Sequence, residues 1–271
     1  MNRLGILLIC LSLSVTGTLS RAGSRWQWQD IRRGAQYVCT SVEINGSTQF
    51  ISAVRYKSCR FRTDIVDAQC AQADSTGALA EKAGAFAAIN GSYFNMRTLE
   101  ALTFLKDEGV EVASTAAGET FRTDGMLALK GRRVRIFAAD TASSSSSTRR
   151  FREAIVAGPL LLREGAEVKQ QWPSGGFFTK RHPRSLIGTD GRGWVYLIVI
   201  DGRFPGQAEG ATIPETVEVA RMFGLRDALN LDGGGSCALW IKEIGVVSHP
   251  YDNHRFDNYG QRIVPNIIAV R

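Results

Sequence analysis

The chain has 271 residues, of which 44% are hydrophobic and 22% are charged, and its formal net charge is +7. This composition is typical of a globular protein. Outside the first segment no run of 18 apolar residues occurs, which excludes a membrane-spanning helix in the rest of the chain. The positive charge favours acidic partners such as anionic glycans, phosphodiester polymers or membrane surfaces.

Residues 1–20 have the pattern of a secretory signal peptide. Arg3 supplies a positive start, residues 4–13 form an apolar stretch, and small and polar residues follow as far as Ser20. We therefore expect a secreted or periplasmic protein. Removal of this segment, which contains one Arg and no acid, lowers the net charge from +7 to +6.

Four cysteines remain after this segment: Cys39, Cys59, Cys70 and Cys237. An even number in an oxidising compartment permits two disulfide bonds, and we expect at least one bridge among the first three. Cys237 has no histidine near it in sequence, so we do not expect it to be a nucleophile. The cysteine spacings do not match a zinc site.

The first half of the chain predicts short strands and one helix. Residues 37–44 and 48–56 form a predicted hairpin around Asn45-Gly46. Ser75 begins a predicted helix through Lys82, with Gly84 at its end. Residues 85–89 follow as a buried strand and residues 101–138 as several short strands. The serine-rich residues 141–148 predict an exposed loop.

The last third gives the clearest pattern. Residues 194–200 (WVYLIVI) are continuously apolar, which indicates a strand buried on both faces. Thr212 and Glu215 form a capping box that begins a helix, Gly224 ends it, and residues 228–231 return as a strand. This βαβ order predicts parallel strands. The expected fold is therefore α/β to α+β: a single domain with a mixed sheet.

Three predicted strands end in a polar residue followed by glycine: Asn90-Gly91, Asp201-Gly202 and Asp232-Gly233. Open α/β sheets bind ligands at the carboxyl ends of parallel strands, so these corners are expected to line one pocket. The glycine run 233–235 offers free backbone N–H groups, which suit an oxyanion or phosphate.

Six motifs occur in one order along the chain: residues 88–95 (AINGSYFN), 157–161 (AGPLL), 181–188 (RHPRSLIG), 197–203 (LIVIDGR), 230–236 (NLDGGGS) and 261–266 (QRIVPN). In this order they resemble the phosphodiester glycosidase family. The resemblance covers residues 85–271, and residues 21–84 form an N-terminal part without an assigned role. Where the family commonly has two glycines after Asn90, this chain has Gly91-Ser92.

The resemblance implies three acidic catalytic candidates. Glycoside cleavage normally uses two carboxyl groups around an oxocarbenium-like state. Asp232 is the candidate general base or cation stabiliser and Asp201 the second carboxylate. Glu215 also matches a family position, although the capping box alone would explain it.

The resemblance also implies a set of substrate-binding residues. Arg184 and Arg203 are phosphate candidates because a guanidinium pairs bidentately with phosphate oxygens. His182 ranks below the acids, and His249 and His254 are interpreted as loop residues. The complete expected binding set is Asn90, Gly91, Tyr93, Arg184, Arg203, Asn230, Gly233, Gly234, Gly235, Ser236 and Arg262.

The expected function is hydrolysis of a sugar-1-phosphodiester, of the N-acetylhexosamine-1-phosphate type, in envelope or extracellular glycans. One alternative is a non-catalytic anionic polysaccharide-binding protein or an exopolysaccharide-processing protein. Another is a metal-dependent phosphodiesterase, in which Asp201, Asp232, Glu215 and Asn230 would hold Ca²⁺ or Mg²⁺. No cofactor is certain, and the expected partner is a sugar-phosphate glycan or a small sugar-1-phosphodiester, not nucleic acid.

Overall fold

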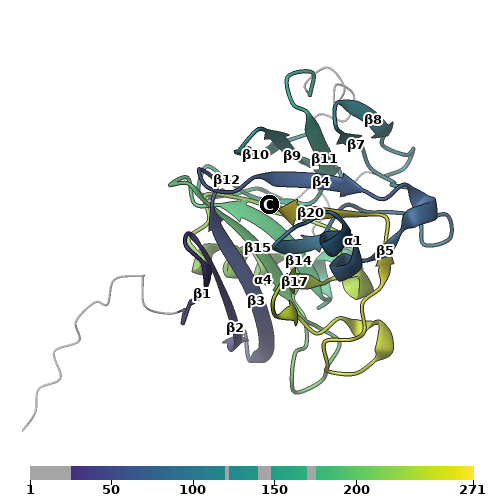
Figure 1. Cartoon of the computed structure of the whole chain (residues 1–271). Coiled ribbons are helices and arrows are strands. Elements are labelled where there is room, and N and C mark those ends of the chain that lie inside the picture. Colours follow the sequence, from purple (N-terminus) through teal and green to yellow (C-terminus); the bar gives the residue numbers. More distant parts are fainter. Residues whose placement is uncertain (1–25, 120–121, 140–147, 170–174) are drawn as a thin grey trace, which may run out of the picture.

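A computed structural model describes residues 26–119, 122–139, 148–169 and 175–271, and antiparallel sheets dominate these segments (Figure 1). The predicted signal peptide and nearly all of the serine-rich segment 141–148 lie outside the described residues. The largest sheet has eight strands in the order β1-β2-β3-β15-β14-β16-β12-β13. Its strands are β1 (Gln29–Arg32), β2 (Ala35–Ile44), β3 (Ser47–Lys57), β12 (Leu160–Arg163), β13 (Ala166–Glu167), β14 (Arg184–Thr189), β15 (Trp194–Ile200) and β16 (Asp227–Asn230).

Two five-stranded sheets accompany it, in the orders β18-β17-β6-β20-β4 and β10-β9-β11-β7-β8, with a small pair of β19 and β5. The first contains β4 (Thr63–Asp67), β6 (Ala87–Asn90), β17 (Leu239–Ile241), β18 (Gly245–Val246) and β20 (Asn266–Val270). The second contains β7 (Leu105–Asp107), β8 (Val110–Ala113), β9 (Gly125–Lys130), β10 (Arg133–Ala138) and β11 (Glu153–Ala157). The pair is β5 (Asp74–Ser75) and β19 (Ile263–Val264).

Helices pack on the outer faces of two of the three larger sheets. The described α-helices are α1 (Thr76–Lys82), α3 (Gly176–Thr179) and α4 (Ile213–Met222), with short 3₁₀ turns η1 (Cys70–Gln72), η3 (Gly234–Ser236) and η4 (Tyr251–Asn253). Helix α1 packs on the sheet of β6, β17 and β20, and α4 packs on the eight-stranded sheet. Among the described residues no helix is long and apolar enough to cross a membrane.

Strand β15 shows why the sequence folds in layers. Its alternate residues Val195, Leu197 and Val199 belong to the core between the sheets, whereas Ile198 and Ile200 pack with α4. The continuous apolar run therefore reflects burial on both faces, as predicted. The same central core takes side chains from all three larger sheets, including Ile89 of β6 and Ile155 of β11.

The local predictions in this scaffold are confirmed. Strands β2 and β3 pair antiparallel around Asn45-Gly46. Ser75 caps α1 through a hydrogen bond from Ala78 N, and Thr212 with Glu215 forms the capping box of α4. The class is α+β, as expected.

The βαβ unit differs from the simplest expectation in one respect. Both β15 and β16 pair antiparallel with β14, which lies between them. The two strands therefore run parallel to each other without being neighbours, and every pairing recorded among the described strands is antiparallel. Because the direction is as predicted, Asp201 and Asp232 still emerge at the same end of the sheet.

The expected disulfide among the first three cysteines is not present, and all four described cysteines are free. Cys59 and Cys70 stand on either side of β4, a five-residue strand about 17 Å long. Cys39 pairs with Ser52 in the β2–β3 ladder, five residues before the end of β3. A bridge requires Cα atoms within about 7 Å, so these positions in the fold explain why the expectation was wrong.

Candidate functional site

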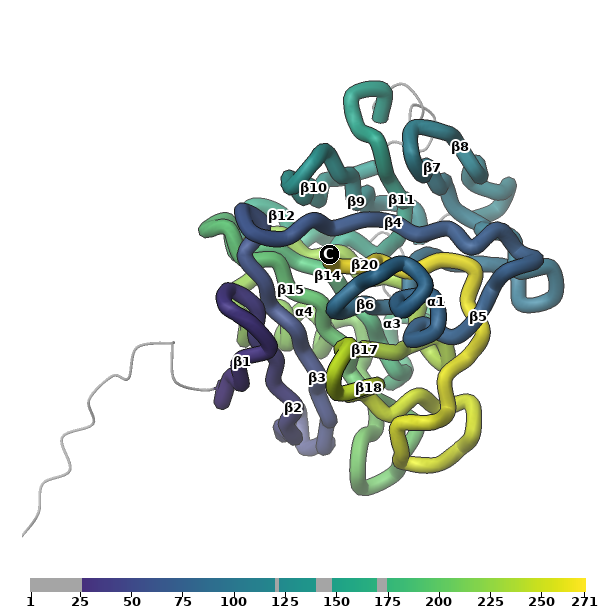
Figure 2. The backbone as a smooth tube through the Cα atoms, in the orientation of Figure 1, coloured from purple at the N-terminus to yellow at the C-terminus, as the bar shows by residue number. Residues whose placement is uncertain are grey.

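The candidate site lies where β15 and β16 end, beside the loops that carry η3 and η4. Figure 2 shows the loop that follows β15, in green, and the loop of η4, in yellow, close together at the bottom of the view. Pro183 connects the two strand ends: its carbonyl accepts from Gly234 N at 3.0 Å, and a Cβ on Gly202 would lie 2.7 Å from its nitrogen. The turns that follow Asp201 and Asp232 therefore both contact Pro183.

The third polar corner joins them from another sheet. Asn90 donates to the carbonyl oxygen of Asp232 at 2.8 Å, and Asp232 N donates to Gly91 O at 3.2 Å. Ser185 Oγ donates to Asn90 Oδ1 at 2.6 Å. The predicted convergence of Asn90-Gly91 with Asp232 is therefore seen, but Asn90 is fully buried. Its side chain holds the corner in position.

Asp232 is the half-buried carboxyl group at the centre of the site. Its Oδ1 accepts from Gly233 N at 2.9 Å. Burial raises the pKa of Asp232 to about 6, against opposing hydrogen bonds from Ser236 and Gly233 and the nearby charge of Arg262. A carboxyl group with this pKa can exchange a proton near neutral pH, which suits general acid–base chemistry.

The glycine run passes between two arginines. Gly234 has φ +63°, and a Cβ there would lie 3.2 Å from Arg203 Nη2. A Cβ on Gly235 would overlap Asp252 Oδ1 and Arg262 Nη2. The absence of side chains at these positions lets both guanidinium groups approach the backbone of η3, so cationic groups and backbone N–H groups lie around the same turn.

The two arginines differ in how they are held. Arg262 forms a bidentate pair with Asp252, with both N–O distances at 2.7 Å. Arg203 is exposed and its guanidinium lies over the Tyr251 ring at 5.1 Å. Arg203 thus offers donors to an incoming anion, whereas the charge of Arg262 is shared with Asp252.

Asp201 has a partner that the sequence did not indicate. Its Oδ2 lies 3.0 Å from His249 N and 2.7 Å from His249 Nδ1. The ring of His249 stacks on Phe256 with centroids 3.8 Å apart. Burial raises the pKa of Asp201, and the contacts with His249 oppose that shift.

Three predicted site residues have structural contacts instead of open positions. Arg184 is 1% exposed and donates to the carbonyls of Ala211, Phe177 and Lys180. Asn230 donates to Tyr93 Oη and Gly158 O, each at 2.9 Å, and both Asn230 and Tyr93 are buried. These side chains shape the walls of the site from behind.

Glu215 also has a structural environment. It closes the capping box of α4 and forms a bidentate pair with Arg181, at 2.6 and 3.2 Å. Burial disfavours its charge, but hydrogen bonds from Arg181 and Thr212 outweigh this and lower the pKa of Glu215. A carboxylate held ionised by an arginine is poorly suited to proton transfer.

The four oxygen ligands proposed for a metal ion do not form one cluster. Asp201 pairs with His249, Glu215 with Arg181, and Asn230 with Tyr93. Within the described ranges there is no group of three or more His, Cys, Asp or Glu side chains that could hold a metal ion. The arrangement is that of an anion site with two carboxyl groups.

Comparisons with known proteins agree with this architecture. The zebrafish N-acetylglucosamine-1-phosphodiester alpha-N-acetylglucosaminidase catalytic domain, auto-inhibited by its pro-peptide, is 17% identical with a TM-score of 0.70, over 88% of this chain and 82% of that one. A hypothetical protein from Synechocystis is 16% identical (TM-score 0.67, 88% and 62% covered). A putative exported protein from Burkholderia pseudomallei is 15% identical (TM-score 0.61, 83% and 74% covered).

At these identities the solved structures establish the fold alone. No curated protein sequence matches the chain significantly. The sequence pattern of the phosphodiester glycosidases, however, matches residues 83–271, which is more than half of the chain. The chain therefore belongs to the phosphodiester glycosidase family of enzymes.

Proposed function

We propose that this protein hydrolyses a sugar-1-phosphodiester of the N-acetylhexosamine type in envelope or extracellular glycans, after export from the cytoplasm. The observation that carries the proposal is the glycine turn of η3, which lies between Arg203 and Arg262 directly after Asp232. A phosphodiester needs cationic donors and backbone N–H groups, and the sugar beside it needs a carboxyl group near its anomeric carbon.

The proposed reaction breaks the bond between the anomeric carbon and the phosphate oxygen. The electron pair leaves with that oxygen, and the phosphate departs as a monoester anion stabilised by Arg203. Ionised Asp232 takes a proton from the attacking water, whose oxygen bonds to the anomeric carbon. Asp201, held by His249, stabilises the positive charge that develops on the sugar.

A screen with isotopic water tests this proposal. The mature protein is incubated in ¹⁸O-water with the α and β anomers of methyl N-acetylglucosaminyl-1-phosphodiester and of the glucose analogue, and products are identified by mass spectrometry. We expect ¹⁸O in the released sugar. Incorporation into phosphate would assign the chain to phosphodiesterases instead. Binding of these compounds without turnover would favour a glycan-binding protein.

Export has a separate measurement. When the full chain is expressed in a bacterial host, mass spectrometry of the extracellular or periplasmic product should show loss of roughly 20 N-terminal residues, as expected for signal-peptide cleavage. Retention of the complete chain in the cytoplasm would contradict this part of the proposal.

A further inference from the structure

A large cavity lies at the end of the eight-stranded sheet opposite to the candidate site. Its volume is about 810 Å³, and its lining includes Thr189, Trp194 and Asp227. These residues end β14 and begin β15 and β16, whereas Asp201 and Asp232 follow the other ends of β15 and β16. Strand β15 has seven residues, and at ~3.3 Å per residue the two regions are about 20 Å apart.

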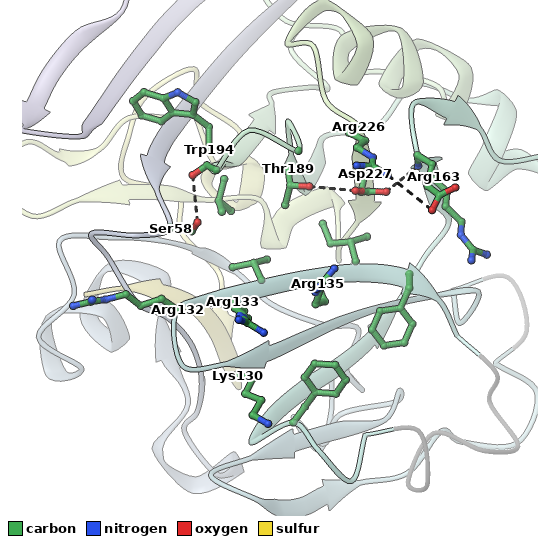
Figure 3. Close-up of a pocket in the computed structure, with 18 of the residues that line it drawn as sticks. Ser58, Lys130, Arg132, Arg133, Arg135, Arg163, Thr189, Trp194, Arg226 and Asp227 are labelled. Carbon is green, nitrogen blue, oxygen red and sulfur yellow. Dashed lines mark hydrogen bonds and ion pairs between the residues drawn. The ribbon is translucent and has the colours of Figure 1, made fainter.

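The cavity is strongly basic, and we call it the basic cleft. Figure 3 shows Arg163 and Arg226 near Thr189 and Asp227, at the end of the eight-stranded sheet, and Lys130, Arg132, Arg133 and Arg135 around the edge hairpin of β9 and β10. Lys130, Arg133 and Arg135 lie on the face of this hairpin that carries Phe137, whereas Val134 and Ile136 face the core. Arg150 completes the cationic lining.

Acidic groups neutralise little of this charge. Among the described residues that line the cleft, two are acids, Glu164 and Asp227, and seven are cations. Glu164 lies 3.9 Å from Arg226, and Asp227 accepts from Glu164 N and Thr189 Oγ1. An excess of five positive charges in one cleft is a large part of the net charge of +7 that the whole chain carries. Like charges at this density repel one another unless an anion lies between them.

We propose that the basic cleft is a second binding site, which holds an anionic polysaccharide chain. Six of its seven cations are arginines, whose planar forks match phosphate or carboxylate groups. The cleft is too large for a single small anion and has the volume of a site for several linked residues. Trp194 lies at its margin, and Lys57 Nζ, 4.3 Å from the ring centroid of Trp194, adds a further positive charge beside the cleft.

Two other polyanions fit less well. Single-stranded nucleic acid needs exposed aromatic rings for stacking, but Phe151 is buried and Phe137 and Trp194 are partly buried. A membrane surface would be accompanied by exposed apolar side chains. Of the large apolar side chains that the structure describes as exposed, none lines the cleft: Met96, Val110, Val112, Ile244, Tyr259 and Ile263.

The choice of a saccharide polymer rests on the proposed function, but binding in the cleft does not require turnover. The cleft would keep a polymeric substrate attached while its cleavable linkages reach Asp232 at the other end of the sheet. The cleft should therefore contribute to the binding of polymeric substrates and not to the binding of small ones.

Charge reversal tests the inference. Binding of fluorescent dextran phosphate to the mature protein is measured for wild type, for Arg133→Glu/Arg135→Glu, and for the matched control Arg33→Glu/Lys242→Glu. All four positions are exposed, and only the first pair lines the cleft. We expect the cleft variant to weaken binding at least ~10-fold and to lower the salt dependence, and the control less than ~2-fold, because local charge sets polyanion affinity. Neutral dextran should not bind.

Several outcomes would overturn the inference: equal weakening by both double variants, unchanged binding in the cleft variant, or tighter binding of a single-stranded DNA oligonucleotide or of phosphatidylglycerol vesicles than of dextran phosphate. Far-UV circular dichroism and melting temperature establish that each variant folds. Asp232→Asn should bind dextran phosphate as wild type does, so failure of the proposed reaction and failure of this site give different results.

Discussion

His249 contacts one carboxylate oxygen of Asp201 twice, through its backbone nitrogen at 3.0 Å and its ring Nδ1 at 2.7 Å. The other oxygen, Oδ1, is buried and has no hydrogen-bond partner among the described residues. One side of the carboxyl group is therefore fixed in orientation.

This pairing predicts that Asp201 and His249 act as a unit. Asp201→Asn and His249→Gln should each lower kcat by about 10²-fold, the scale of a lost acid–base or electrostatic group. The double variant should be little worse than either single variant, because residues that act together give non-additive losses. A double-mutant cycle on kcat measures this, with Asp190→Asn in a distant exposed turn as the control. Additive losses would show two independent roles.

Asp232→Asn should separate activity from stability. Turnover should fall at least ~100-fold because the carboxylate is lost. In wild type, the rate limb that depends on ionised Asp232 should rise through a pH of about 6, the pKa of Asp232.

The same variant should be more stable than wild type at neutral pH. Burial raises the pKa of Asp232 from 3.8 to about 6, so the folded state binds more protons than the unfolded state between these values. Wild-type stability therefore declines as pH rises through that window, by ~3 kcal/mol on the scale of 1.4 kcal/mol per pKa unit. Melting temperatures of both proteins should converge near pH 4 and separate above pH 6. A gap that persists unchanged at pH 4 would contradict this assignment.

Arg203 should contribute to recognition of charged substrates only. Arg203→Ala should lower kcat/KM for a sugar-1-phosphodiester by an amount equivalent to about 2–3 kcal/mol, and Arg203→Lys should restore little because it lacks the planar fork. A neutral aryl glycoside, if turned over, should be unaffected. Arg192→Ala, in an exposed turn beside β15, is the matched control. Equal losses on charged and neutral substrates would point to altered folding.

Gly235→Ala should disrupt the Arg262–Asp252 pair. The added Cβ would overlap both Asp252 Oδ1 and Arg262 Nη2. We expect KM for the phosphodiester to rise more than ~5-fold, the scale of one weakened charge-assisted hydrogen bond. Gly175→Ala, whose nearest neighbour would be 3.8 Å away, controls for loss of a glycine. If Gly235→Ala matched this control, the close approach of the pair would have no part in binding.

We expect Arg184 to contribute mainly to the stability of the fold. Arg184→Ala removes hydrogen bonds to three backbone carbonyls and leaves a buried space, so unfolding free energy should fall by roughly 3 kcal/mol or more. Urea denaturation of Arg184→Ala and Arg192→Ala provides the comparison. A folded Arg184→Ala protein with unchanged stability and impaired phosphate recognition would restore the role inferred from sequence.

Local signals in the sequence predicted much of the scaffold. The apolar run of β15, the capping box at Thr212 and the hairpin turn at Asn45-Gly46 each depend on residues close together in the chain. The three polar-Gly corners were also found, since each follows a strand. These features reflect backbone preferences that neighbours alone determine.

The side-chain partners could not be predicted in the same way. His249 is 48 residues from Asp201, and Arg181 is 34 residues from Glu215. No spacing rule connects such pairs, because only the packing of separate loops brings them together. The buried position of Arg184 could not be foreseen for a related reason: arginine is rarely buried, and its carbonyl partners come from α3 and the loop before α4.

The part of the chain that matches the family is shorter than the unit that folds. The family match begins at residue 83. Yet β3 pairs with all seven residues of β15, and β4 pairs with all five of β20. A fragment cut at that boundary would expose two bare strand edges, and such edges recruit other chains. Excision by homology would therefore give an aggregating product, and in the full chain the strands between Gln29 and Asp67 cover these edges.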